Sequence, residues 1–134
     1  MVNNKIWDEI AKKAEEDYGL LVGNERIIYN LRKVIDAVND RNLLILYTDS
    51  DYYSAEDSIE DFYTVGLDEI AVVLESANAM FPGGCPPEDY YDRVDIINSW
   101  DGEYDDFFQQ LTEDILEFFI EMENCYDKLI SEIE

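Results

Sequence analysis

The chain has 134 residues, with 33 Asp and Glu against nine Lys and Arg, and its formal net charge is −24. Its hydrophobic content of 47% and aromatic content of 13% exclude the acidic disordered class, which is poor in both kinds of residue. The length suits one domain, and the absence of any run of about 18 apolar residues excludes a transmembrane helix.

The negative charge is concentrated in the last two thirds of the chain. Residues 1–41 hold seven basic and eight acidic groups, whereas residues 42–134 hold two basic groups, Arg93 and Lys128, and 25 acidic ones. A charge of this size governs solubility and the choice of partner rather than the fold. We therefore expect a cationic partner and, because acidic lipid surfaces repel an anionic protein, no membrane binding.

Two further features bear on the compartment. Cys85 and Cys125 form neither a metal-binding cluster nor a disulfide framework, and they fit reduced thiols. The N-terminal segment is amphipathic and lacks the apolar stretch of a signal peptide. We therefore expect a cytoplasmic location.

Apolar residues recur at helical spacing through most of the chain, and local signals mark where the helices begin and end. The pattern predicts a first helix over roughly 3–18, which Gly19 ends, and a second helix that Asn24 caps. The apolar run 43–47 fits either a buried strand or a short helix. Its position among helical segments favours the helix.

The middle of the chain contains the clearest helical pattern. Ser54, three residues before Asp57, predicts a capped helix that Gly66 ends. The next helix has apolar residues at three- and four-residue steps over 67–80. It stops at the proline- and glycine-rich run 82–87, because proline cannot continue a helix.

Three more helices are predicted after this run. Pro87 can occupy the first turn of one of them, and residues 98–102 form a loop. A short helix follows over 104–111, and Thr112 caps the last and longest helix. The helix that starts near Pro87 is expected to bury Tyr90 or Tyr91, Val94 and Ile97. The sequence thus predicts a single all-α domain over residues 1–134, with about six to eight helices.

The usual signals of catalysis are missing. The chain has no histidine, the commonest general base and zinc ligand, and Gly83-Gly84 has no phosphate-binding lysine beside it. Pairs of carboxylates suited to glycoside hydrolysis carry no signal in a chain with 33 of them. We therefore expect no enzymatic activity and no cofactor.

A calcium loop is the nearest match to a metal site. Four acidic residues fall at liganding positions of an EF-hand loop: Asp49, Asp51, Asp57 and Glu60. The position that requires glycine is Ser54, so the match fails and we expect no metal site. A calcium-dependent or hydrolytic protein remains the alternative from a different functional class.

The acidic residues also form rows at helical spacing. Asp57, Glu60 and Asp61 share one face of a predicted helix, and Glu113, Glu117 and Glu121 follow at four-residue steps. Each like-charged pair at i and i+4 costs roughly 0.2–0.5 kcal/mol, so selection for stability alone would place lysines among them. The net charge equals that of about 41 Å of duplex DNA, while the domain is roughly 36 Å across. By composition alone, a binding surface and a merely solvated acidic shell stay equally open.

One segment resembles a known family. Leu67 to Arg93 is similar to the helix–loop–helix signature of a bacterial family of unknown-function domains. Its most specific part reads Ala77-Asn78-Ala79-Met80-Phe81-Pro82-Gly83-Gly84, followed by Pro86-Pro87-Glu88-Asp89. The C-terminal pattern Tyr104-Asp105-Asp106-Phe107-Phe108 also resembles the family. The resemblance spans roughly residues 39–130, but residues 42–49 lack the glycines and glutamine usual for the family there.

The characterised member of that family is a DNA mimic that inhibits a helix-turn-helix transcription factor. The resemblance therefore implies an all-α fold, no catalysis, the possibility of a homodimer, and an acidic face in place of direct nucleic-acid binding. The expected partner is a basic DNA-binding protein such as a transcription regulator. The carboxylates expected to imitate phosphates are Asp49, Asp51, Glu56, Asp57, Glu60, Asp61, Glu103, Asp105, Asp106, Glu113, Asp114, Glu117 and Glu121. The first alternative is an immunity-type or antitoxin-like inhibitor of a basic toxin.

Overall fold

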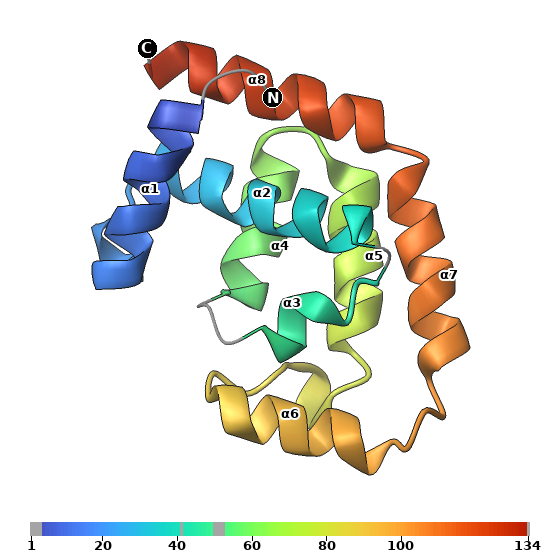
Figure 1. Cartoon of the computed structure of the whole chain (residues 1–134). Helices are drawn as coiled ribbons and strands as arrows, with labels where there is room; N and C mark the ends of the chain where they lie inside the picture. The colour runs from blue at the N-terminus through green and yellow to red at the C-terminus, as the bar shows by residue number, and fades with distance from the viewer. Residues whose placement is uncertain (1–3, 41, 50–52, 134) are drawn as a thin grey trace.

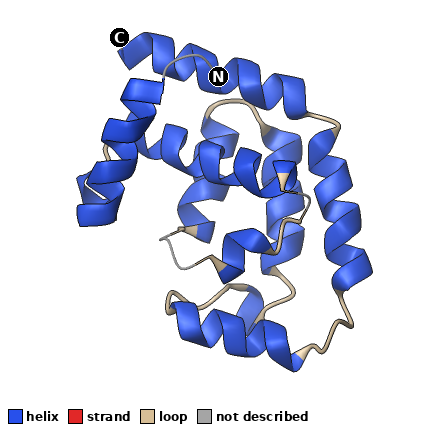
Figure 2. Cartoon of the chain, in the orientation of Figure 1, coloured by secondary structure: helices blue, strands red, loops and turns tan. Residues whose placement is uncertain are grey.

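The structure, a computed structural model, describes residues 4–40, 42–49 and 53–133 (Figure 1). Within these ranges the chain forms eight α-helices, two short 3₁₀ helices and no strand (Figure 2). The predicted all-α fold of six to eight helices is confirmed. The helices are α1 (Asn4–Glu16), α2 (Asn24–Asn39), α3 (Ile45–Thr48), α4 (Ala55–Thr64), α5 (Asp68–Asn78), α6 (Tyr90–Ser99), α7 (Asp105–Leu116) and α8 (Phe119–Ile133), with 3₁₀ helices η1 (Tyr18–Leu20) and η2 (Pro82–Gly84).

The helices form an inner group and a surrounding frame (Figure 1). Inside, α4 and α5 make a hairpin, and α2 packs against α4. Around them, α1 and α8 pack on α2, α7 packs beside α5, and α6 packs on α3. In the view of Figure 1, α6 runs along the bottom and α7 along the right side. These two helices therefore meet at a corner and do not lie along each other.

A single core fills the space between the helices, and Tyr47 of α3 lies in it fully buried. The Tyr47 ring centroid is 5.0 Å from that of Phe81 and 6.4 Å from that of Phe108. Its hydroxyl donates a hydrogen bond to Asn78 Oδ1 at 2.7 Å. The run 43–47 therefore contributes to a helix, as predicted, because Leu46 and Tyr47 are buried from one short turn.

Caps define the ends of α4 and α6. Ser54 Oγ accepts a hydrogen bond from Asp57 N at 3.1 Å, and Gly66 follows α4 with φ +82°, both as predicted. The expected start of α6 near Pro87 is wrong by three residues. Asp89 accepts a hydrogen bond from Asp92 N at 3.1 Å, so the helix begins at Tyr90.

The buried face of α6 also differs from the prediction. Its buried residue is Arg93, whereas Tyr91 is 74% exposed and Val94 and Ile97 are half-buried. The Arg93 guanidinium donates to Tyr47 O at 3.1 Å, Pro87 O at 3.1 Å and Glu88 O at 2.7 Å. It thereby ties α6 to α3 and to the proline-rich loop.

The prediction that Thr112 caps the last helix is wrong. Thr112 lies inside α7, fully buried, where its hydroxyl donates to Phe108 O at 2.7 Å and accepts from Leu43 N at 2.9 Å. α7 therefore continues to Leu116, and the last helix begins at Phe119. The loop before α7 lies at 100–104 instead of the predicted 98–102, because α6 extends to Ser99 and α7 begins at Asp105.

Candidate protein-binding surface

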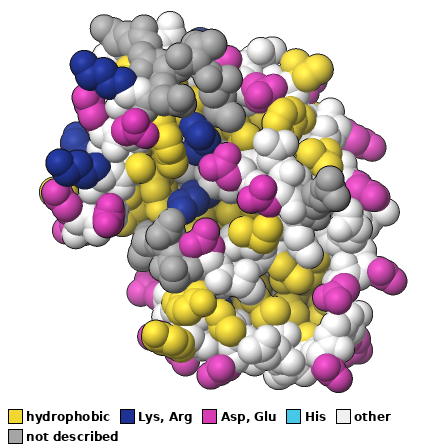
Figure 3. Space-filling model, in the orientation of Figure 1, with side chains coloured by type: hydrophobic (Ala, Val, Ile, Leu, Met, Phe, Trp, Pro, Cys, Tyr) yellow, Lys and Arg dark blue, Asp and Glu magenta, His cyan; other side chains and the backbone are white. Residues whose placement is uncertain are grey.

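The surface of residues 53–133 is strongly anionic. Of the two basic residues in this range, Arg93 is buried and Lys128 is exposed. Figure 3 shows acidic side chains along the bottom and right edges, over α6 and α7, while basic side chains gather toward α1 and α2. Residues 94–127 contain 11 acidic residues and neither Lys nor Arg. No Lys or Arg of this stretch therefore offsets the carboxylates around α7.

Three exposed carboxylates form a row on α7 and its C-terminal end, the α7 row: Asp106, Glu113 and Glu117. Helical geometry places them within roughly 40° of one another around the axis, opposite the buried Phe108 and Ile115. Along the axis they are spaced by roughly 10 Å and 6 Å. The burial of one face of α7 thus directs these three carboxylates straight outward.

The predicted row Glu113, Glu117 and Glu121 does not run along one helix. α7 ends at Leu116 and α8 begins at Phe119, so the chain turns between the second and third of these residues. Glu121 is exposed, but it belongs to α8. This part of the prediction is wrong, because sequence spacing continues across a break that tertiary packing introduces.

The acidic face of α4 is occupied by an ion pair within the protein. Asp57, Glu60 and Asp61 share a face, as predicted, but that face is directed at Arg26 of α2. Arg26 Nη2 lies 2.5 Å from Asp61 Oδ1 and 3.6 Å from Glu60, and Nη1 lies 3.6 Å from Asp57. Asp61 is only 2% exposed, so its assignment to a phosphate-imitating surface is wrong. Its hydrogen bond raises the pKa of Arg26, which keeps the guanidinium charged.

Two more side chains complete this network. Asn30 Nδ2 donates to Asp61 Oδ2 at 3.1 Å and to Tyr18 Oη at 3.0 Å, and Tyr18 donates to Asp57 Oδ2 at 2.9 Å. Burial raises the pKa of the Tyr18 phenol, so it stays a donor at neutral pH. Asp57 therefore links η1, α2 and α4 and is half-buried rather than free on the surface.

The remaining predicted residues differ in exposure. Glu56, Glu103 and Asp105 are exposed, and Glu56 accepts a hydrogen bond from the Cys85 thiol at 3.2 Å. Asp49 and Asp114 are half-buried, and Asp114 accepts from Gln110 Nε2 at 2.9 Å. Asp51 lies outside the described residues.

Sequence reasoning did not include five exposed carboxylates on neighbouring helices. Asp92 and Asp95 lie on the outer face of α6, and Asp68, Glu69 and Glu75 lie on the outer face of α5, beside α7. The sequence contains a signal for these residues: on a helical wheel of each segment, the acidic residues fall opposite the apolar face. With them, exposed carboxylates lie on α5, α6 and α7 alike.

An apolar corner adjoins the α7 row. Leu116 is 40% exposed and Ile120 is 69% exposed, on either side of the turn from α7 to α8. Glu113, Glu117 and Glu121 flank them in the sequence. Exposed apolar side chains surrounded by charged ones are a common composition of protein interfaces.

Within the described part of the chain, no group of three or more Cys, Asp or Glu side chains is arranged to hold a metal ion. None of the helices described has the length and apolar composition needed to cross a bilayer. No protein-family model, curated protein or solved structure matches this chain.

Proposed function

We propose that this protein is an acidic binding protein that occupies the nucleic-acid-binding surface of a basic partner, such as a transcription regulator. The observation that carries the proposal is the α7 row, three outward carboxylates in a stretch without Lys or Arg. The same proposal assigns it no catalysis and a cytoplasmic location, where the free thiols Cys85 and Cys125 would stay reduced.

Charge density supports imitation of one DNA strand. Residues 105–117 span roughly 18 Å along α7, a length over which one strand of a duplex carries about five phosphates. This segment carries five carboxylates, of which Asp106, Glu113 and Glu117 form the outward row and Asp105 and Asp114 lie on either side of it. A second strand would correspond to the acidic face of α5, since α5 packs beside α7 and α6 does not. Two copies would repel each other at this surface, so a homodimer would use another.

The apolar corner favours a second candidate function. Leu116 and Ile120 are exposed beside the carboxylates, and a duplex backbone offers no comparable apolar group. In protein interfaces a few anchors buried at the centre carry most of the binding energy, and charges exposed at the rim carry little. An immunity-type inhibitor of a basic toxin would need such anchors and no DNA-like shape.

Capture followed by competition separates the two candidates. The immobilised protein is exposed to a lysate of its source organism at low salt, and retained proteins are eluted with duplex DNA or with polyglutamate of equal total charge. Under the proposed function, the retained proteins bind DNA themselves. Duplex DNA should then elute them at a lower concentration of negative charge than polyglutamate does. If duplex DNA and polyglutamate elute the retained proteins equally well, the result would contradict DNA mimicry and favour the inhibitor.

Matched variants locate the binding surface. The triple variant Asp106→Asn, Glu113→Gln, Glu117→Gln should weaken Kd for a retained partner by about tenfold or more. Its control, Glu9→Gln, Glu15→Gln, Glu16→Gln, makes the same change of net charge on exposed positions of α1. Equal weakening by both triples would mean that total charge, and not the α7 row, drives binding. A Kd that barely changes between ~50 mM and ~200 mM salt would refute the electrostatic mechanism altogether.

A further inference from the structure

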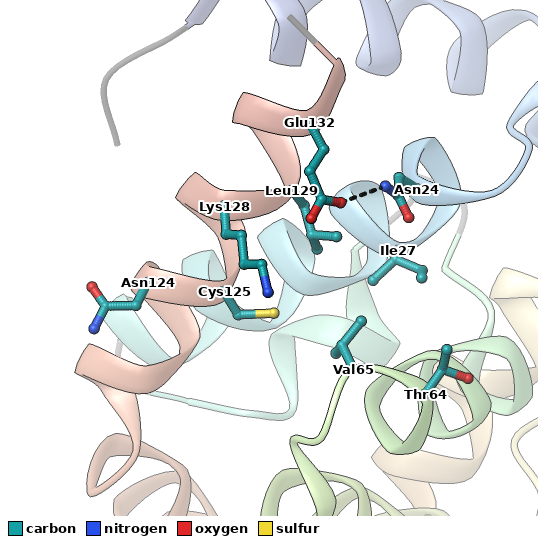
Figure 4. Close-up of a pocket in the computed structure, with 9 residues that line it drawn as sticks. All are labelled: Asn24, Ile27, Thr64, Val65, Asn124, Cys125, Lys128, Leu129 and Glu132. Carbon is teal, nitrogen blue, oxygen red and sulfur yellow. Dashed lines mark hydrogen bonds between the residues drawn. The ribbon is translucent and has the colours of Figure 1, made fainter.

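A cavity of about 510 Å³ lies between α8, the N-terminal end of α2 and the residues that end α4 (Figure 4). Apolar side chains of Ile27, Val65 and Leu129 line its floor, and uncharged polar side chains of Asn24 and Thr64 stand at its rim. Small-molecule sites combine such a floor with a few polar groups in a volume of roughly 300–1,000 Å³.

Lys128 distinguishes this cavity from the rest of the anionic surface of residues 53–133. It is the exposed basic residue of the range 53–133, and its side chain extends along the cavity wall beside Cys125 (Figure 4). None of the ion pairs in the described part of the chain involves Lys128. The Glu132 carboxylate, one turn further along α8, also lines the cavity, but it is turned toward Asn24, whose Nδ2 donates a hydrogen bond to it at 3.0 Å (Figure 4). The ammonium group is therefore available to a ligand.

The apolar floor and the Lys128 ammonium group together favour one class of ligand. An apolar floor favours a hydrocarbon body, and a lone ammonium group at its edge favours one anionic head. The net charge of the protein opposes the approach of any anion, but salt screens exposed charges beyond about 8–10 Å. A head in contact with Lys128 lies well inside that distance. We propose that this cavity binds a small amphiphilic carboxylate, with its chain on the floor and its head against Lys128.

The two cysteines provide a readout within the same molecule. Cys125 lines the cavity, whereas Cys85 lies against Glu56 of α4, outside it. Burial raises the pKa of both thiols, so both are slow to react at neutral pH, and labelling is best followed at about pH 8.5. A ligand in the cavity should slow the alkylation of Cys125 alone.

The probe is decanoate, with 1-decanol as its uncharged counterpart and N-ethylmaleimide as the alkylating reagent, followed by mass spectrometry of each cysteine peptide. At about ten times its Kd, decanoate should slow labelling of Cys125 about tenfold and leave Cys85 unchanged. Decanol should bind at least about tenfold more weakly. Equal slowing of both cysteines, no slowing, or equal protection by decanol would each overturn the proposal.

Variants test the role of the ammonium group. Lys128→Met should weaken decanoate binding by about tenfold or more, and Lys128→Arg should retain it. Lys12→Met is the matched control, since it removes one exposed charge from α1. Undiminished decanoate binding by Lys128→Met would overturn the proposed head contact. The α7 triple variant should bind decanoate normally, which separates this site from the partner-binding surface.

Discussion

At the scale of single residues, burial decides which carboxylates are structural. Asp61 and Glu60 are adjacent in the sequence and both lie near Arg26. Asp61 is 2% exposed and receives hydrogen bonds from both Arg26 and Asn30, whereas the Glu60 side chain is 73% exposed. A buried charge that loses its partner is costly, while an exposed pair contributes little. The same residue type therefore has opposite roles at neighbouring positions.

We expect Asp61→Asn to lower the free energy of unfolding by about 2 kcal/mol or more, because Arg26 then loses its closest anionic partner. Glu60→Gln makes the same change of net charge on the same helix and should stay within about 0.5 kcal/mol of the unmodified protein. Urea unfolding at neutral pH measures both. Equal effects of the two substitutions would show that the burial of Asp61 does not decide its contribution to stability.

At the scale of elements, one buried hydroxyl joins two distant segments. Thr112 sits in the middle of α7 and accepts a hydrogen bond from the backbone N–H of Leu43, which leads into α3. Such a bond anchors a short helix that could not persist alone, because a few residues form too few hydrogen bonds to offset their loss of freedom. The position of α3, and with it Tyr47, depends on this contact.

Thr112→Val keeps the shape of the side chain and leaves the buried Leu43 N–H without its acceptor. We expect a loss of about 1–3 kcal/mol in the free energy of unfolding. Thr64→Val is the control, because the exposed Thr64 hydroxyl only donates to Glu60 O within its own helix. Thermal and urea unfolding of the two variants should differ clearly. A Thr112 variant as stable as the control would mean that Leu43 N–H finds another acceptor.

At the scale of the whole molecule, like charges oppose the compact state. A net charge of −24 is confined to a small domain, and few basic groups are available to pair with the carboxylates. Salt screens the repulsion between exposed charges, so it should stabilise this protein.

Between ~20 mM and ~300 mM NaCl, Tm should therefore rise by about 4 °C or more. The triple variant Asp106→Asn, Glu113→Gln, Glu117→Gln should start from a higher Tm at low salt and gain less, because three of the repelling charges are gone. Differential scanning calorimetry measures both. A Tm that falls as salt is added would show that paired charges outweigh repulsive ones.

The sequence by itself determined the fold class, most helix positions and the uneven distribution of charge. These follow from local properties: apolar spacing, caps such as Ser54, breakers such as Gly66, and a count of ionisable groups. It also identified Glu113 and Glu117 as exposed neighbours on a helix. Errors arose where a local signal was ambiguous, as for Thr112, which can cap a helix or accept a hydrogen bond from inside one.

Only the tertiary structure decided which acidic rows reach the solvent. It turned the α4 carboxylates toward Arg26, broke the row between Glu117 and Glu121, and brought α5 beside α7. It also assembled the cavity around Lys128 from three segments far apart in the chain. The physical reason is the same in each case: exposure and charge pairing depend on which helices pack together, and helix packing joins residues that sequence spacing cannot relate.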